Sequence, residues 1–231
     1  MAKAWLRYLL FLAPREQLDG MSWRLFLGPA LIATWLAGMG RYWDHPSAQL
    51  LQMFGLGSVV YVFVLGALLW GVIAPLRPRR WGYLQVVTFV SLTSPPAILY
   101  ALPVERWMSV KDAIVVNAWF LAIVATWRVA LLLFVLRRFA ELSWPRTLVG
   151  AFLPLVAIVA SLVSLNLDKA VFEIMAGLHP RPPTPNDGAY AVLVLLSFLS
   201  SCAALPLLVA YFVLVGTAWR ERRGARPVSP S

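Results

Sequence analysis

The residue of this sequence whose position most suggests chemistry is an arginine inside a long apolar stretch. Arg128 lies within residues 113–136, roughly 12 Å along a helix from the nearer end of that stretch. A guanidinium at this depth in a membrane costs several kcal/mol and usually faces protein or a water-filled cavity. No acidic residue lies in any other long apolar stretch to neutralise it. The sequence therefore predicts a polar centre at Arg128, unless its long side chain extends to the lipid headgroups and only anchors the helix.

Other polar residues are expected at a similar depth. Asn117 precedes Arg128 by 11 residues, which places both on nearly the same face of a helix. Ser91, Thr34 and Tyr211 fall at matching positions in neighbouring apolar stretches. Together these side chains predict one polar seam through the protein. A seam with a cationic centre is typical of a small permease or channel that attracts anions.

A second group of reactive side chains lies in the short segments between apolar stretches. His45 next to Asp44, together with Glu105, offers a general base and a carboxylate to orient it. If these segments converge, the group suits a membrane enzyme that acts on lipid-linked substrates at the outer face. The alternative is a turn, because Asp44 and His45 precede Pro46 where the chain leaves a helix. No recognisable ligand spacing joins His45 and His179, so no metal or cofactor is expected.

Two adjacent prolines interrupt one apolar stretch. Pro95 and Pro96 follow Ser94, and each proline removes a backbone donor, so we expect a broken helix at this point. Carbonyl groups freed by such a break accept hydrogen bonds from a neighbouring helix, from water or from an ion. The sequence contains no phosphate-binding glycine loop and no hydrolase motif. The proline pair therefore indicates architecture more than catalysis.

Composition predicts the class of protein that positions these residues. Of 231 residues, 61% are hydrophobic and 13% are charged, and the mean hydropathy is +0.75. These values are typical of a membrane protein. Each long apolar stretch suffices for a helix that crosses a bilayer, and a helix satisfies its own backbone hydrogen bonds in lipid. We therefore expect an all-α, polytopic integral membrane protein with six transmembrane helices, at residues 22–39, 54–76, 83–102, 113–136, 147–167 and 189–217.

The distribution of basic residues predicts the orientation. Lys and Arg concentrate in alternate connecting segments and at both ends, whereas the other segments mix few bases with acids. Cytosolic segments retain Lys and Arg, so both termini are predicted on the cytosolic side. The net charge of +10 therefore reflects membrane orientation, and no nucleic acid partner is expected. The basic side carries Lys3, Arg7, Arg15, Arg24, Arg77, Arg79, Arg80, Arg137, Arg138, Arg146, Arg220, Arg222, Arg223 and Arg226.

The two ends of the chain are expected to lie outside the six-helix domain. Within residues 1–21, Trp5 and Leu9 oppose Lys3 and Arg7, a pattern that predicts a short amphipathic helix on the inner leaflet. Residues 218–231 are basic and predicted to be a disordered cytosolic tail. The single cysteine excludes an internal disulfide.

Two features predict contacts with other proteins. Ser197, Ser200, Ser201 and Ala204 give the last apolar stretch a smooth face suited to close helix packing. The outer loop 168–188 joins a short apolar run to several prolines, which make it stiff and extended. We expect this loop to lie on the outer leaflet or to cover the bundle as a lid. Either position leaves it available to a partner.

These observations favour a non-enzymatic subunit or accessory factor of a cell-envelope membrane complex, whose partners are the lipid bilayer and other membrane proteins. A permease built around Arg128 and Asn117, and an enzyme built around Asp44, His45 and Glu105, are the alternatives. Short loops and the strong basic asymmetry favour the bacterial cytoplasmic (inner) membrane.

Overall fold

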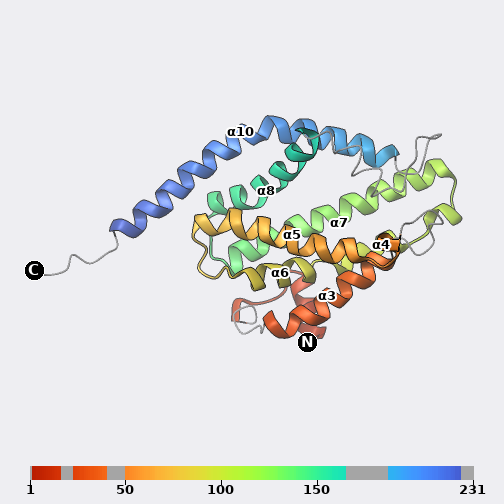
Figure 1. Ribbon diagram of the computed structural model, residues 1–231, viewed down its shortest axis with the longest axis horizontal. Coiled ribbons are helices and arrows are strands. Elements are labelled where there is room, and N and C mark those ends of the chain that lie inside the picture. Colours follow the sequence, from red (N-terminus) through yellow and green to blue (C-terminus); the bar gives the residue numbers. More distant parts are fainter. Residues whose placement is uncertain (1, 17–22, 41–49, 165–186, 225–231) are drawn as a thin grey trace, which may run out of the picture.

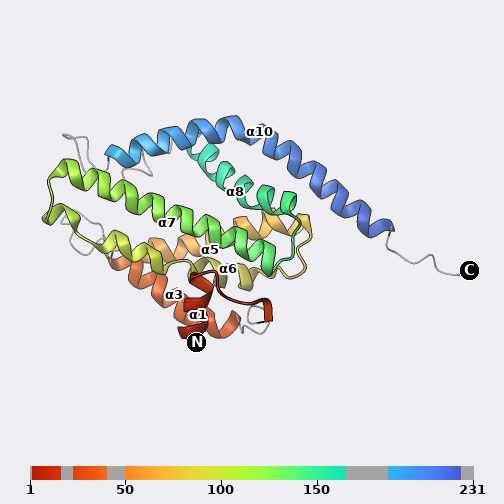
Figure 2. The same cartoon turned by 180° about the vertical axis from the view of Figure 1, so that it is seen from behind.

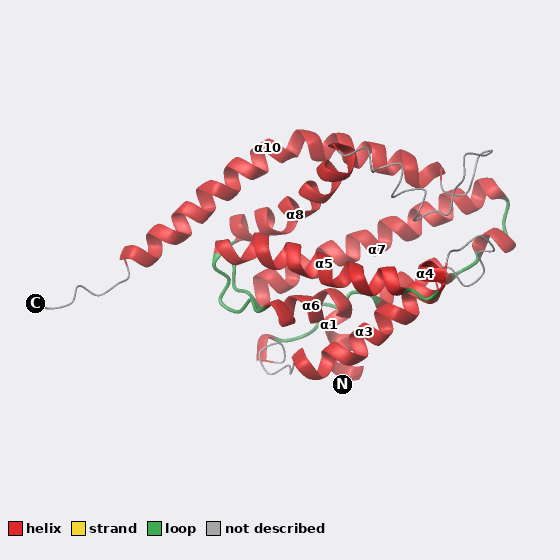
Figure 3. Cartoon of the chain, in the orientation of Figure 1, coloured by secondary structure: helices red, strands yellow, loops and turns green. Residues whose placement is uncertain are grey.

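The computed structural model of the protein describes residues 2–16, 23–40, 50–164 and 187–224. Helices make up nearly all of these segments, and no β-strand occurs within them (Figures 1 and 3). The expected all-α class is therefore confirmed for the described part of the chain. The elements are α1 (Ala2–Leu9), α3 (Trp23–Gly40), α4 (Leu50–Met53), α5 (Leu56–Ile73), η1 (Ala74–Leu76), α6 (Tyr83–Leu92), η2 (Pro95–Ala101), η3 (Val104–Arg106), α7 (Val110–Arg138), α8 (Trp144–Ser164) and α10 (Asp187–Gly224).

Several of these helices are suited to a lipid environment. Four are long and apolar enough to cross a membrane, over Leu56–Leu76, Lys111–Arg138, Trp144–Ser161 and Leu195–Glu221. Two shorter apolar helices cover Arg24–Met39 and Tyr83–Leu99. All six overlap apolar stretches that the sequence predicts to be helical spans. The chain is therefore an integral membrane protein with at least four candidate spans among its described residues.

The bundle has two packed sides joined by α7. On one side α3, α5 and α6 pack against one another, and on the other α8 packs against α10. α7 contacts α8, α10 and η2, and so holds the two sides together. Figures 1 and 2 show α10 and α8 at the top, α7 and α5 in the middle, and α3 and α6 below. The core between them includes Leu69 and Ile73 of α5, Val86 of α6, and Leu131 and Leu136 of α7.

α3 and the start of α5 approach each other closely at two glycines. Gly55 has a φ of +62°, and a Cβ at this position would lie 2.8 Å from both the carbonyl oxygen of Trp35 and the backbone nitrogen of Met39. A Cβ on Gly38 would lie 3.1 Å from the carbonyl oxygen of Gly55. The indole Nε1 of Trp35 donates to the carbonyl of Phe54 at 2.7 Å. Only glycine permits both the left-handed conformation and the contact at position 55.

The last helix, α10, is the least covered of the four candidate spans. Within its apolar stretch Leu195–Glu221 only Ser200 and Ala218 are buried, although the helix packs along α8 and α7. The helix continues through Pro206 and ends at Gly224, so it includes the first residues of the segment expected to be a disordered tail. Most of the α10 surface is therefore left to lipid or to another protein.

The segments predicted to be cytosolic meet at one end of the bundle. Glu141, between α7 and α8, forms ion pairs with Arg15 of the N-terminal segment and with Arg79 of the α5–α6 loop. Arg146, in the first turn of α8, pairs with Glu221 near the end of α10 at 2.8 Å. The basic segments that the sequence assigns to one side of the membrane thus lie side by side.

Candidate functional site

The helix break predicted at the proline pair is present, and it lies inside the bundle. α6 ends at Leu92, and the chain continues as the 3₁₀ helix η2 from Pro95. Pro95 and Pro96 have no N–H, so they cannot donate to the carbonyls of Ser91 and Leu92, which would be their partners in a continuous α-helix. The prediction of a broken helix is confirmed. The Ser91 carbonyl accepts from the amide of Ser94 at 3.1 Å, so the carbonyl groups of Leu92 and Thr93 define the candidate site.

Two of the carbonyls at the end of α6 receive donors from distant elements. Trp5 of α1 donates its indole Nε1 to the carbonyl of Leu92 at 3.1 Å. Arg128 of α7 donates its Nε to the carbonyl of Thr93 at 3.3 Å. Carbonyl oxygens at the end of a helix carry partial negative charge. A cation and an indole N–H are therefore favourable partners for the broken end.

A hydroxyl pair from α3 and η2 completes the polar cluster. The Thr34 hydroxyl donates to the carbonyl of Ala30 at 2.9 Å. It lies 2.7 Å from the hydroxyl of Ser94 and 3.4 Å from the carbonyl of Ser91. Thr34, Ser91 and Ser94 are all buried. The hydroxyl groups of the cluster therefore have hydrogen-bond partners within the protein, as a membrane interior requires.

The position of Arg128 bears on whether this residue forms a polar centre inside the bundle or only anchors the helix at the lipid headgroups. Arg128 is half-buried, and its Nε bonds to backbone inside the bundle. An arginine that only extended to the lipid headgroups would have no such bond. Its terminal Nη atoms have no hydrogen-bond acceptor among the residues that the structure describes. Arg128 thus joins the broken end of α6 and keeps donors for a further partner.

The other residues of the expected polar seam are placed differently. The hydroxyl of Ser91 donates to its own helix at 2.9 Å, and Thr34 joins it at the break. Asn117 lies about 16 Å from Arg128 along α7, and it is half-buried. Tyr211 of α10 packs against the hydrophobic core. Ser91 and Thr34 therefore accompany Arg128 at the break, whereas a continuous seam through Asn117 and Tyr211 stays a prediction.

The N-terminal segment also belongs to the site, which the sequence analysis did not foresee. α1 is helical where an amphipathic helix is expected, and Tyr8 on its inner face is fully buried. The indole Nε1 of Trp127, the neighbour of Arg128, donates to the carbonyl of Leu9 at 3.0 Å. The ring of Phe11 then contacts the rings of Trp127 and Phe134, at centroid distances of 6.0 and 5.8 Å.

This contact pattern fixes the path of the N-terminal segment. From α1 the chain follows α7 past Phe134 to Arg15, which pairs with Glu141. Figure 2 shows α1 and the following segment below α7 and α6. The three-residue spacing of Trp5, Tyr8 and Phe11 was the signal available in the sequence, because it places aromatic rings on one side of the segment.

The residues expected to support acid–base chemistry are not placed by the structure. Asp44 and His45 lie outside the described residues, as does most of the outer loop 168–188. Glu105 falls in η3, and its side chain is not described. The hypothesis of an enzyme at the outer face therefore stays a prediction.

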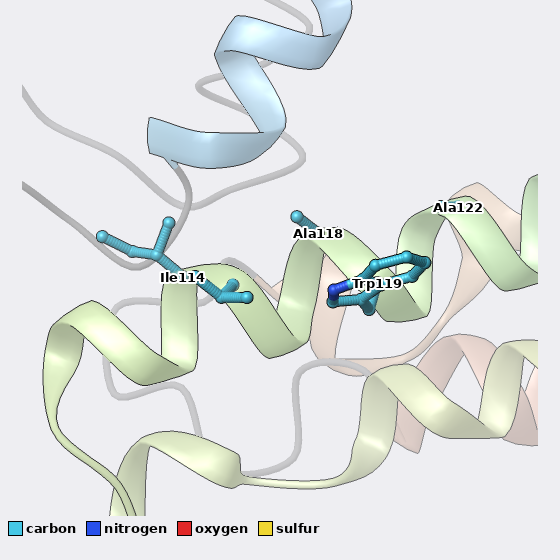
Figure 4. Close-up of a pocket in the computed structure, with 5 residues that line it drawn as sticks. Ile114, Ala118, Trp119 and Ala122 are labelled. Carbon is cyan, nitrogen blue, oxygen red and sulfur yellow. The ribbon is translucent and has the colours of Figure 1, made fainter.

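An open apolar groove lies on the N-terminal half of α7. Its volume is about 300 Å³, and its lining residues are Ile114, Val115, Ala118, Trp119 and Ala122. Figure 4 shows these side chains along one face of the helix. All five are apolar, so the groove suits a lipid acyl chain better than a polar substrate. Within the described ranges, no three His, Cys, Asp or Glu residues come together as metal ligands would.

Comparison with known protein families, with curated proteins and with solved structures finds no match to this chain.

Proposed function

We propose that the protein is a non-enzymatic multi-pass membrane protein that acts as a subunit or accessory factor of a cell-envelope membrane complex. The polar groups at the α6 break support this proposal, because the hydrogen bonds that they make are to one another and to backbone. Trp5 and Arg128 donate to the carbonyls of Leu92 and Thr93, and Thr34 donates to the carbonyl of Ala30 in its own helix. Such a centre rigidifies a bundle, and rigid bundles serve as scaffolds for other membrane helices.

The observation that carries the proposal is the uncovered surface of α10. Leu205 and Phe212 are 70% and 64% exposed, and Ser201 and Cys202 are exposed on the same helix. Exposed apolar side chains alone fit lipid. Small side chains among them allow a second helix to approach closely. We therefore assign α10 as the surface that packs against a partner helix.

The same proposal includes six spans with both termini in the cytosol. The two shorter apolar helices, Arg24–Met39 and Tyr83–Leu99, serve as the first and third spans, the third with its break at the prolines. The meeting of Arg15, Arg79 and Arg146 at one end supports this topology. The short loops support the bacterial cytoplasmic membrane.

Site-specific photo-crosslinking in native membranes tests the proposal. A photoreactive residue at Leu205 of α10 is compared with one at Ile98 of η2, which is 65% exposed. We expect a discrete protein adduct from position 205 and none from position 98. Lipid adducts alone at both positions, together with a lone monomer in mild detergent, would contradict the subunit proposal.

A small permease is the second candidate, favoured by the inward orientation of Arg128. It requires water to reach the terminal Nη atoms, which have no acceptor among the described residues. A cysteine at Ala125 or Arg128, in a Cys202→Ser background, tests access from water. Reaction with aqueous thiol reagents from both sides would support a path. No reaction from either side would exclude it.

A further inference from the structure

Three buried nitrogen donors at the basic end of the bundle lack a hydrogen-bond partner. They are Nη1 of Arg77, Nε1 of Trp81 and Nε of Arg146. Buried donors of native proteins are almost always paired, and an unpaired one costs more when it belongs to a charged group. Their grouping in the α5–α6 loop and the first turn of α8 indicates that an acceptor from outside the chain binds there.

The two arginines belong to neighbouring elements. Leu76 precedes Arg77, and its Cδ1 would lie 3.2 Å from a Cβ on Gly150 of α8. Arg146 is one turn earlier on the same helix. Leu76 is fully buried, so this contact fixes the end of η1 against α8. Arg77 and Arg146 therefore extend from the junction of these two elements.

The end of α10 holds both side chains in place. The guanidinium carbon of Arg77 lies 4.2 Å from the ring centroid of Trp219. Nη2 of Arg146 bonds to Glu221 at 2.8 Å. Each guanidinium is thus fixed through one part, while another of its N–H groups stays buried and unpaired. Fixed donors without acceptors are the arrangement that a bound anion requires.

The charge balance at this junction also favours an anion. The first turn of α8 contains Arg146 and no acidic residue, although a cation at the start of a helix is electrostatically unfavourable. Glu221 already bonds to Arg146, and Glu141 already bonds to Arg15 and Arg79. Glu141 and Glu221 are therefore engaged, and the basic residues of this end outnumber its acids.

We propose that the phosphate of an anionic phospholipid headgroup binds at the junction of η1, α8 and α10, where it accepts hydrogen bonds from Arg77 and Arg146. A guanidinium matches phosphate oxygens in geometry and charge. The exposed Trp144 and Trp219 flank this junction, and tryptophan prefers the headgroup region. Phe212 and Val213 of α10 are exposed about two turns from Trp219, and they offer an apolar surface to the acyl chains. A free anion would gain nothing from that surface.

Lipid binding to the purified full chain tests this site. Native mass spectrometry compares phosphatidylglycerol with phosphatidylcholine, which has the same phosphate but no net charge. We expect the wild type to bind phosphatidylglycerol at least about tenfold more tightly, because charge-assisted hydrogen bonds hold the anionic headgroup. Equal binding of the two lipids would overturn the proposal.

The decisive variants keep the charge and remove the donors. Arg146→Lys retains a cation for Glu221 but has no Nε donor, and Arg77→Lys loses the planar guanidinium. We expect each to lose most of the preference for phosphatidylglycerol. Arg138→Lys, at an exposed arginine of the same end, is the matched control and keeps it. An equal loss in all three would mean unspecific attraction to charge and would overturn the site.

Two further measurements separate the remaining explanations. In phosphatidylcholine alone, Arg146→Lys should melt like the wild type, because the donor that it removes has no partner there. A lowered melting temperature would show a structural role for the donor and contradict the site.

Inorganic phosphate is then added to the complex with phosphatidylglycerol. Retention of the lipid is expected, whereas its displacement would identify a site for a free anion and overturn the assignment to lipid.

Discussion

The Nε of Arg128 lies 3.3 Å from the carbonyl oxygen of Thr93. The arginine that the sequence places inside the apolar stretch 113–136 therefore caps the broken end of α6. The bond joins α7 to a helix that the chain left 35 residues earlier. It gives the guanidinium a partner of partial negative charge without any acid in the apolar stretches. A membrane-buried arginine can thus be structural.

We expect Arg128→Met to destabilise the protein by about 1 to 2 kcal/mol. The methionine fills part of the space of the arginine stem, but the Thr93 carbonyl loses its donor in apolar surroundings. Thermal melting in detergent, followed by tryptophan fluorescence, measures the change. The control is Arg138→Met, at an exposed position in the last turn of α7. If Arg128→Met melts no lower than the control, the capping bond contributes nothing, and the permease alternative gains weight.

We expect Trp5→Phe to destabilise the protein by about 1 kcal/mol, since it removes one partly buried hydrogen bond. The lost bond is the one from Nε1 to the Leu92 carbonyl, 3.1 Å long. Hydrogen exchange at the end of α6 should rise in parallel. Trp119→Phe, at an exposed tryptophan of α7, should change neither quantity. Unchanged exchange in Trp5→Phe would mean that α1 does not hold the break.

The two sides of the α6 break differ in how far the sequence predicts them. Pro95 and Pro96 remove local donors, so the break follows from the chain's own chemistry. The partners of the freed carbonyls cannot be predicted in this way, because Trp5 lies 87 residues from Leu92. Only the three-dimensional packing brings them together. Arg128 was expected in a seam of polar side chains, and its observed partner is a backbone carbonyl that no sequence pattern marks.

The helices themselves were predictable because lipid leaves the backbone few alternatives. Apolar length locates these helices even where one of them, such as α6, is short. The amphipathic pattern of α1 likewise predicts a helix. It does not predict that Tyr8 is fully buried. Aromatic residues recur at the same helical spacing whether their rings face lipid or protein. Burial against a neighbour depends on packing that one segment cannot specify.

The contact between α3 and α5 predicts a strong effect of a single methyl group. Gly55→Ala should destabilise the protein by about 2 kcal/mol or more, because the alanine is strained at φ +62° and its Cβ meets backbone atoms at 2.8 Å. Thermal melting provides the measurement. Gly57→Ala is the matched control, since a Cβ there has nothing within 4 Å and alanine favours a helix. Similar melting of both variants would show that α3 and α5 are not in contact at Gly55.

The ion pairs of Glu141 should contribute little in spite of their central position. Its partners Arg15 and Arg79 are 44% and 65% exposed, and such pairs stabilise proteins by about 0.2 to 1 kcal/mol each. We expect Glu141→Gln to lower the melting temperature slightly at low salt and not at high salt, because salt screens exposed charges. Glu16→Gln, at the neighbour of Arg15, serves as control. A large loss that persists in high salt would contradict this account.

Tyr8 predicts a variant that is more stable than the natural chain. Its side chain is fully buried, its hydroxyl has no hydrogen-bond partner, and its ring lies edge-on to Phe89 at 6.5 Å. Tyr8→Phe keeps the ring and removes the unpaired hydroxyl, so we expect a gain of about 1 kcal/mol at neutral pH. Tyr83→Phe is the control, because the Tyr83 hydroxyl donates to the carbonyl of Phe63 at 3.3 Å and its removal should give no gain.

Alkaline pH provides the second test of the same residue. Burial raises the pKa of Tyr8 well above its ordinary value, so the unfolded chain loses this proton at a lower pH than the folded protein. The contribution of Tyr8 to stability is therefore complete below the unfolded pKa of about 10 and decreases as the pH rises above it. The stability advantage of Tyr8→Phe should grow over this alkaline range. A constant difference between the two proteins from neutral pH upward would show that water reaches the Tyr8 hydroxyl and that α1 is not docked against α6.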